Sequence, residues 1–388
     1  MSRLFYMPPT IVSGSGSLSA AGDQLCLGKK ALIVTGKVVK EQPCTKELLQ
    51  LLRSKGVVCD VFSDIPGEPT DRMVRACVTA YLNGGCDYMI AVGGGSPMDL
   101  MKAAAVLLKY PGAALRDFMG KVIPGPFVPM AAIPTTAGTG SEATMFTVIT
   151  DTETEVKMLL KGPELIPDVA VVDPAFSVSA PQNITANTGL DALTHAVESY
   201  TSRLAQPLTD TLALSAVKRI MAYLPRAWRD GADLTAREQM ALAALEAGVC
   251  ITNASVTLVH GMSRPIGALF HVPHGLSNAM LLPTCLEFAL PGALSRFADL
   301  GRAIGAASAH QSDEEAAAAF LTAVKQLCII CQVPTPEQYG ITKQDFFAQI
   351  DKMAADAVAS GSPGNTAREV TEADCACLLY TSDAADDS

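Results

Sequence analysis

The sequence predicts an α/β domain with a parallel sheet, followed by an all-helical domain. Between residues 30 and 175, short β-branched or apolar runs alternate with helical stretches, which is typical of a parallel sheet covered by helices on both faces. After Pro181 these strand signals stop, and the chain becomes rich in Ala and Leu at helical spacing. The length of 388 residues also exceeds what one hydrophobic core usually contains. We therefore expect an α/β domain at residues 1–180 and a helical domain at residues 181–376.

Five runs are expected to form the strands of the sheet. In chain order they are ALIVT (31–35), VVCDVF (57–62), YMIAV (88–92), PMAAIPT (129–135) and VAVVD (169–173). The segment TVITDTETEVKML (147–159) alternates on either side of a polar turn, which predicts a β-hairpin attached to that sheet. In the second half, TDTLALSAVKRIMAYL (209–224) and AREQMALAALEAGVCITNA (236–254) have the periodicity of helices.

Charge and composition argue against nucleic-acid and membrane partners. The formal net charge is −10, and Lys and Arg are scattered, so no patch attracts a phosphate backbone or an anionic membrane. The N-terminal MSRLFYMPPT lacks the extended apolar stretch of a secretion signal, and we expect a cytoplasmic protein. Eleven cysteines at irregular spacings fit reduced thiols of that compartment. Cys328 and Cys331 form a CxxC motif, but their apolar helical surroundings favour a core position over a metal or redox role.

The last twelve residues differ from the rest of the chain. CLLYTSDAADDS (377–388) shows no helical periodicity that continues the preceding segment. The codons that encode most of it can also spell an adaptor attached during sequencing-library preparation. We therefore predict that residues 377–388 are a non-native tail in place of the native C-terminus. Finding the same codons in independently sequenced genomic DNA would refute this.

A glycine-rich loop follows the third expected strand directly. It consists of Gly93, Gly94, Gly95 and Ser96 and is followed by Pro97. Ser96 suits a helix N-cap, Pro97 suits the first helical position, and Asp99 completes a capping box. Glycines let the backbone approach a ligand, and a helix N-terminus presents free N–H groups to an anion. The loop therefore predicts a phosphate site.

A second loop, PTTAGTGSE (134–142), follows the fourth expected strand. It repeats the combination of glycines with hydroxyls, at Thr135, Thr136, Thr139 and Ser141. Two such loops at the carboxyl ends of strands in one open sheet would flank a dinucleotide. Either loop alone fits a tight strand-to-helix turn equally well, and the GxGxxG fingerprint is absent. Together, the two loops favour a Rossmann-like dinucleotide site.

Four of the five histidines of the chain lie in two short segments. Asp191 and His195 are four residues apart in a helical segment and so share one helix face. Farther on, HGMSRPIGALFHVPHG supplies His260, His271 and His274. One carboxylate and three imidazoles would bind a divalent ion such as Fe(II) or Zn and favour negative charge on an alcohol oxygen. The alternative is that each histidine is an ordinary core residue with its hydrogen bonds satisfied. For any single histidine this alternative is the stronger one, but for the whole set metal binding is favoured.

These motifs resemble the iron-containing (group III) alcohol dehydrogenases, a family that includes lactaldehyde reductases and 1,3-propanediol dehydrogenases. The resemblance extends from about Pro9 to Asp374 and is carried by GGGSPMD, PTTAGTGSE, PDVAVVDP, GLDALTHAVE and HGMSRPIGALFHVPHGLSNAMLLP, in this order. It implies a homodimer or higher oligomer that uses NAD(H) or NADP(H) with a metal. The implied metal ligands are Asp191, His195, His260 and His274. The implied coenzyme-binding residues are Gly93, Gly94, Gly95, Ser96, Asp99, Thr135, Thr136, Ser141 and Lys157.

Two positions depart from the family pattern. Some relatives have a histidine four residues after the third metal ligand, where this chain has Arg264. His271 is then the nearby imidazole suited to proton transfer. At the end of the first expected strand, NAD-preferring relatives have an aspartate, where this chain has Gly36 followed by Lys37. Without that carboxylate a 2′-phosphate meets no repulsion, and Lys37 can attract it. We therefore expect Gly36 to lie at the coenzyme and NADP(H) to be accepted or even preferred.

The sequence therefore predicts hydride transfer between NAD(P)(H) and a small alcohol, diol or aldehyde. In this hypothesis the metal polarises the substrate oxygen, and the protein positions the coenzyme and the ion relative to the substrate. Two alternatives remain open at this point. One is a lyase resembling dehydroquinate synthase, which combines a dinucleotide with zinc. The other is a cofactor-binding protein without catalytic turnover.

Overall fold

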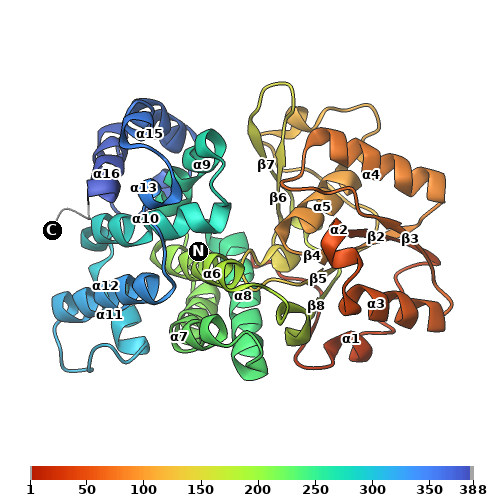
Figure 1. Cartoon of the computed structure of the whole chain (residues 1–388), viewed down its shortest axis with the longest axis horizontal. Helices are drawn as coiled ribbons and strands as arrows, with labels where there is room; N and C mark the ends of the chain where they lie inside the picture. The colour runs from red at the N-terminus through yellow and green to blue at the C-terminus, as the bar shows by residue number, and fades with distance from the viewer. Residues whose placement is uncertain (1, 385–388) are drawn as a thin grey trace. The chain divides into compact units, whose positions relative to one another are not determined.

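The computed structural model describes residues 2–384 (Figure 1). The chain divides into two compact units. One unit is Tyr6–Ala180, and the other begins at Pro181 and also includes residues 2–5. The α/β and all-helical classes predicted from the sequence are confirmed for these two units.

The α/β unit is built on a six-stranded parallel sheet with the order β1-β8-β5-β4-β2-β3. Its strands are β1 (Thr10–Ser13), β2 (Lys30–Thr35), β3 (Val58–Phe62), β4 (Tyr88–Gly93), β5 (Met130–Pro134) and β8 (Val169–Val172). Its helices are α1 (Ser17–Ala20), α2 (Lys37–Lys40), α3 (Pro43–Ser54), α4 (Asp71–Gly84) and α5 (Gly95–Lys109). All five predicted strands are present. The chain runs from β2 outward to β3 and then returns to β4 on the other side of β2, so the strand order reverses between β2 and β4.

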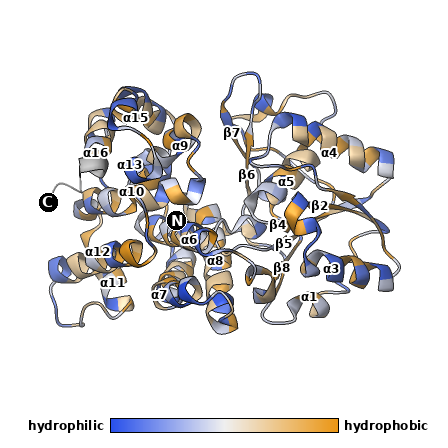
Figure 2. Ribbon diagram, in the orientation of Figure 1, coloured by the Kyte–Doolittle hydropathy of each residue, from blue (hydrophilic) through white to orange (hydrophobic). Residues whose placement is uncertain are grey.

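The alternation of side chains along the strands separates two hydrophobic cores. In β2, Leu32 and Val34 belong to one core, and Ala31 and Ile33 belong to the other. Neighbouring side chains of a strand point to opposite faces of a sheet. Because both faces are buried, the inner strands are continuous apolar runs. The covering helices need only one buried side, and Figure 2 shows hydrophobic and hydrophilic residues interleaved along α3 and α4.

Two features of the α/β unit differ from expectation. The edge strand β1 was not predicted, because four residues after a Pro-Pro pair carry too short a pattern. The predicted hairpin forms from β6 (Phe146–Thr150) and β7 (Lys157–Lys161), but as a separate two-stranded sheet. Its β6 strand contacts α5, the helix that covers the main sheet, so the expectation that it joins that sheet is wrong.

The second unit contains only helices and short turns among its described residues. Its longer helices are α6 (Gln182–Thr201), α7 (Pro207–Arg229), α8 (Leu234–Ala254), α9 (Leu258–Phe270), α10 (His274–Ala289), α11 (Leu294–Ala303), α12 (Asp313–Ile330), α15 (Ile350–Ala359) and α16 (Glu372–Ala384). Two short helices, α13 (Pro336–Tyr339) and α14 (Lys343–Phe347), lie between α12 and α15. Within residues 2–384 no single helix has the length and apolar composition of a membrane span. The consecutive helices α8 and α9 pass that test as a pair, with a bend of 103° between them.

The C-terminal segment is helical, contrary to the expectation from its sequence. Helix α16 continues to Ala384, and Leu378 and Leu379 are buried. Two adjacent leucines give no clear helical period, which explains why the pattern was missed. Residues 385–388 of the predicted tail lie outside the described residues. The non-native origin of residues 377–388 stays a prediction.

No disulfide joins the cysteines in the described part of the chain. Cys328 in α12 and Cys331 at its end are both buried. Burial raises the pKa of each of these thiols to about 12, so both stay protonated near neutral pH. Their positions fit the predicted packing role.

Candidate metal centre and dinucleotide loops

Four side chains of the helical unit converge on one point. They are Asp191 and His195 from α6, His260 from α9, and His274, the first residue of α10. Their ligand atoms all lie within 4.8 Å of one another. Asp191 Oδ1 lies 3.7 Å from Nε2 of His195, 3.6 Å from Nε2 of His260 and 3.7 Å from Nε2 of His274. A tetrahedral site with bonds of about 2.1 Å separates its ligand atoms by about 3.4 Å, so the residues present fit a divalent ion.

Local structure explains why these residues meet. The four-residue spacing places Asp191 and His195 on one face of α6. The rings of His195 and His260 stack with centroids 4.6 Å apart and planes inclined by 17°. Close approach of α10 to α6 requires Gly275, because a Cβ there would lie 2.4 Å from the backbone oxygen of Asn187. Gly275 thus lets the neighbouring His274 reach Asp191.

A second buried carboxylate, Glu198, orients the centre and was not selected from the sequence. Its Oε2 lies 2.5 Å from Nδ1 of His260. Its Oε1 accepts hydrogen bonds from the Thr257 hydroxyl at 2.9 Å and from the Val259 N–H at 2.7 Å. Burial would raise the pKa of Glu198, but His260 and the hydrogen bonds from Thr257 outweigh it and lower that pKa. Glu198 follows Asp191 by seven residues, two turns along the same helix face, and this spacing was the signal that the sequence offered.

Burial and the two carboxylates set the protonation of the imidazoles. Because Glu198 is a carboxylate, Nδ1 of His260 carries a proton, and the neutral form of this ring keeps a lone pair on Nε2. Burial lowers the pKa of His260, but Glu198 and Asp191 outweigh it and raise that pKa, so a cation that binds Nε2 competes with a proton. Desolvation against the cluster, together with the neighbouring imidazoles, lowers the pKa of His274, so that ring is neutral at physiological pH. With Glu198 counted, the buried set has two negative charges, which match the charge of a divalent cation. The sequence alone had indicated one.

The centre differs in exposure from one side to the other. The side chains of Asp191, His195 and His260 are at most 6% exposed, whereas that of His274 is 42% exposed. Solvent therefore reaches the ligand set from the side of His274.

The predicted proton-transfer residue, His271, is not part of the ligand cluster. It is the C-cap of α9, has a left-handed backbone conformation and is exposed. Arg264 donates to the Ser362 hydroxyl at 2.8 Å.

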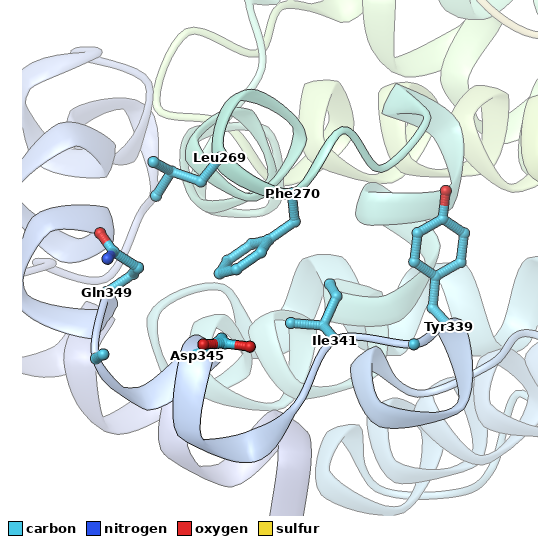
Figure 3. Close-up of a pocket in the computed structure, with 8 residues that line it drawn as sticks. Leu269, Phe270, Tyr339, Ile341, Asp345 and Gln349 are labelled. Carbon is cyan, nitrogen blue, oxygen red and sulfur yellow. The ribbon is translucent and has the colours of Figure 1, made fainter.

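A cavity of 480 Å³ lies near this turn in the helical unit (Figure 3). Leu269 and Phe270 at the end of α9 line one side, and Ile341, Asp345 and Gln349 line the other. None of the four clustered ligands lines it. The cavity is therefore separate from the metal centre.

In the α/β unit, the two glycine-containing loops pack directly against each other. The Thr135 N–H donates to the carbonyl of Gly93 at 2.9 Å. Gly93 has a φ of 150°, and a Cβ there would lie 2.8 Å from Cγ of Pro97. At Gly94 and Gly95, an added Cβ would lie 3.3 Å and 3.1 Å from the side chains of Thr136 and Thr139. Gly93 is therefore required by the turn into α5, and larger residues at Gly94 and Gly95 would press on the second loop. Local packing thus accounts for these glycines without a ligand.

The predicted capping box at the start of α5 is wrong. The helix begins at Gly95, with Gly94 as its N-cap and no side-chain cap. Ser96 and Pro97 thus lie inside the first turn. The Asp99 carboxylate instead accepts from the Ser141 hydroxyl at 2.9 Å and from the Val148 N–H at 3.0 Å. Asp99 and Ser141 therefore hold the second loop and the hairpin against α5.

A buried lysine that the sequence reading missed completes this connection. Lys102 in α5 is 0% exposed. Its Nζ lies 2.7 to 3.1 Å from the carbonyls of Ser141, Thr144 and Phe146 and the hydroxyls of Ser141 and Thr144. Burial lowers the pKa of Lys102 to about 8 and raises that of Glu142 to about 7. The sequence signal for this buried lysine was its position within the apolar run MKAAAVLL.

The remaining predicted coenzyme residues lie near the ends of other strands. Gly36 follows β2 and caps α2. Beside it, Lys37 pairs with Asp64 at 3.1 Å, and both side chains are exposed. Lys157 at the start of β7 pairs with Glu68 at 2.8 Å. Gly36, the first glycine loop and the second loop thus follow β2, β4 and β5, three adjacent strands of the sheet.

Comparisons with known proteins decide the family. A family model described as iron-containing alcohol dehydrogenase matches residues 8–174, and one for the C-terminal region of that family matches residues 185–382. The chain belongs to the iron-containing alcohol dehydrogenase family. It is an oxidoreductase of the alcohol dehydrogenase and aldehyde reductase type, as the sequence resemblance indicated.

Individual relatives match over most of their length. The chain is 42% identical to a probable alcohol dehydrogenase, EutG, of Escherichia coli over 304 residues, or 78% of this chain and 77% of the relative. A crystal structure of 1,3-propanediol oxidoreductase has a TM-score of 0.94 and 33% identity, with 98% of this chain and 100% of the other covered. A sulfoacetaldehyde reductase from Bifidobacterium kashiwanohense in complex with NAD+ has a TM-score of 0.88 and 28% identity, with both chains fully covered. Family membership leaves the lyase alternative without support.

Proposed function

We propose that this alcohol dehydrogenase interconverts small primary alcohols or diols and their aldehydes, with Fe(II) as its metal and NADP(H) accepted beside NAD(H). The observation that carries the proposal is the convergence of one carboxylate and three imidazoles in the helical unit. A divalent cation bound there supplies a Lewis acid for the substrate oxygen, and the nicotinamide ring supplies or takes the hydride. The donor set suits Fe(II) and Zn alike, and the family favours iron.

The chain's own residues have distinct roles in this proposal. Asp191, His195, His260 and His274 hold the cation, and Glu198 fixes the tautomer of His260. The dinucleotide lies across the carboxyl ends of β2, β4 and β5, where the strand order reverses. There it contacts Gly36, the loop of Gly93 to Ser96, and Thr135 and Thr136. Asp99, Ser141 and Lys157 act by shaping and flanking these loops.

The test is an anaerobic purification followed by metal analysis and activity assays. We expect about one iron per chain, or zinc as the alternative, and turnover of short aldehydes with NADPH and NADH. Stoichiometric metal without turnover of any aldehyde or alcohol would favour a protein that binds its cofactors without catalysis. His271 is proposed as the proton-transfer group, and an unchanged pH profile of activity in His271→Gln would reject that role.

Two further proposals concern the oligomeric state and the cellular location. We propose a homodimer or larger homo-oligomer in the cytoplasm, as the resemblance and the N-terminal sequence predicted. Light scattering coupled to gel filtration checks the assembly, and a monomer at micromolar concentration would contradict it. Fractionation of the source cells checks the location.

Coenzyme choice can be tested at Gly36. We expect Gly36→Asp to lower kcat/KM for NADPH by about 10- to 100-fold, because the new carboxylate would repel a 2′-phosphate. The value for NADH should stay within about threefold. In the wild type, Asp64 pairs with Lys37 and reduces the attraction of Lys37 for a 2′-phosphate. The pair is exposed and therefore weak, so a bound phosphate can compete with Asp64.

Gly36→Ala is the matched control for this substitution. A Cβ at this position has its nearest neighbour at 4.0 Å, so the methyl group fits without strain. Steady-state kinetics with both coenzymes should show no change in preference. If Gly36→Asp and Gly36→Ala keep the same ratio of NADPH to NADH activity, Gly36 does not face the 2′ position.

A further inference from the structure

A buried amide, Asn278, is directed into the metal centre. It lies on α10, one helical turn after His274, and is 0% exposed. Its Nδ2 lies 2.7 Å from Asp191 Oδ1, 3.1 Å from Nε2 of His260 and 3.3 Å from Nε2 of His274. One amide nitrogen thus contacts three of the four ligand atoms.

The chemistry of these atoms fixes which end of the amide faces them. Asp191 Oδ1 can only accept a hydrogen bond. In the neutral, metal-binding form of His260, Nε2 is also an acceptor, because Glu198 holds the proton of that ring on Nδ1. The amino group must therefore face the cluster, since the amide oxygen there would meet only lone pairs.

The amide oxygen of Asn278 shows that this arrangement has a cost in folding free energy. Asn278 Oδ1 is buried and has no hydrogen-bond partner among the residues that the structure describes. Buried polar atoms are nearly always hydrogen-bonded, and an exception calls for a compensating role. A leucine has a similar size and would leave no unpaired oxygen. The contacts of the amino group are the gain that offsets this cost.

We propose that Asn278 is a positioning residue of the metal centre, which holds Asp191 Oδ1 in its ligand position by a hydrogen bond. This inference rests on the proposed function. A carboxylate oxygen has lone pairs for both a metal ion and an N–H donor, so Asp191 can keep this bond when a cation is present. The imidazole lone pairs then go to the ion. Asn278 also covers the face formed by Asp191, His260 and His274, so a substrate oxygen approaches across another face.

Metal affinity measured without turnover tests this proposal. Metal-free wild type and Asn278→Leu are titrated with Zn2+ in competition with a chromogenic chelator, and both are loaded with Co2+ for absorption spectra. We expect the Kd for Zn2+ to rise about 10- to 100-fold in the variant, as is usual when a partner of a metal ligand is lost. The Co2+ bands should shift because Asp191 is no longer fixed.

Asn253→Leu is the matched control, since Asn253 lies on α8 of the same unit and its Nδ2 donates to the carbonyl of Val249 at 2.8 Å. It should bind Zn2+ as the wild type does. If Asn278→Leu fails to fold, Asn278→Ser provides a smaller side chain whose hydroxyl is too short to replace the amide, with the same loss expected. A folded variant with wild-type Zn2+ affinity and an unchanged Co2+ spectrum would overturn the proposal. A wild type that binds no metal would instead reject the proposed function.

Discussion

Replacing Asp191 with Ala is expected to remove the metal and reduce alcohol oxidation by at least about 10³-fold. Asp191 is the one anionic member of the ligand set, and its Oδ1 lies within 3.7 Å of all three Nε2 atoms. Without it, three neutral imidazoles must hold a divalent ion in a buried site, with Glu198 as the remaining counter-charge. A bound metal contributes several kcal/mol to transition-state stabilisation, and about 1.4 kcal/mol corresponds to a tenfold change in rate.

Metal analysis and steady-state kinetics on the same preparation check this expectation. Asp299→Ala is the control, because Asp299 lies on α11 of the same unit and accepts a hydrogen bond from the Tyr200 hydroxyl at 3.2 Å. It should keep full metal content and activity. Retention of one metal per chain by Asp191→Ala would show that the ion binds elsewhere, and the assignment of the ligand set would then be wrong.

Replacing Lys102 with Met is expected to destabilise the α/β unit by about 3 to 5 kcal/mol. The methionine fills similar space but leaves three carbonyls and two hydroxyls without the ammonium that they share. It also removes the positive charge that attracts Asp99 and Glu142. Loss of one partner from a buried set of charges and hydrogen bonds has costs of this size. Because the freed loop carries Ser141, weaker coenzyme binding should accompany the loss of stability.

Urea unfolding followed by circular dichroism measures this effect. Lys109→Met is the control, since Lys109 lies on the same helix and is partly exposed, and the carbonyl of Gly125 is the oxygen that it contacts. Its replacement should cost about 1 kcal/mol or less. Metal content should be unchanged in both variants, because the ligands belong to the helical unit. A cost below about 1 kcal/mol for Lys102→Met would mean that solvent or another side chain replaces the ammonium.

The sequence determined those features that depend on neighbours along the chain. The buried strands are continuous apolar runs, and the two glycine-containing loops are adjacent to strand ends, so both could be recognised locally. The four-residue spacing of Asp191 and His195 defines a shared helix face without any tertiary information. The order of the motifs was specific enough to indicate the family that the comparisons then showed.

Tertiary structure decided the features that depend on contacts between distant segments. Asp99 could cap its own helix or bond to Ser141, 42 residues away, and the packing of the hairpin on α5 selected the second arrangement. Glu198, Lys102 and Asn278 are ordinary polar residues in the sequence. They acquire roles because folding places them, without solvent, beside partners 18 to 87 residues away. Local pattern records which residue types are present and with what period, but the desolvation and the partners that give a buried polar group its role exist only in the folded chain.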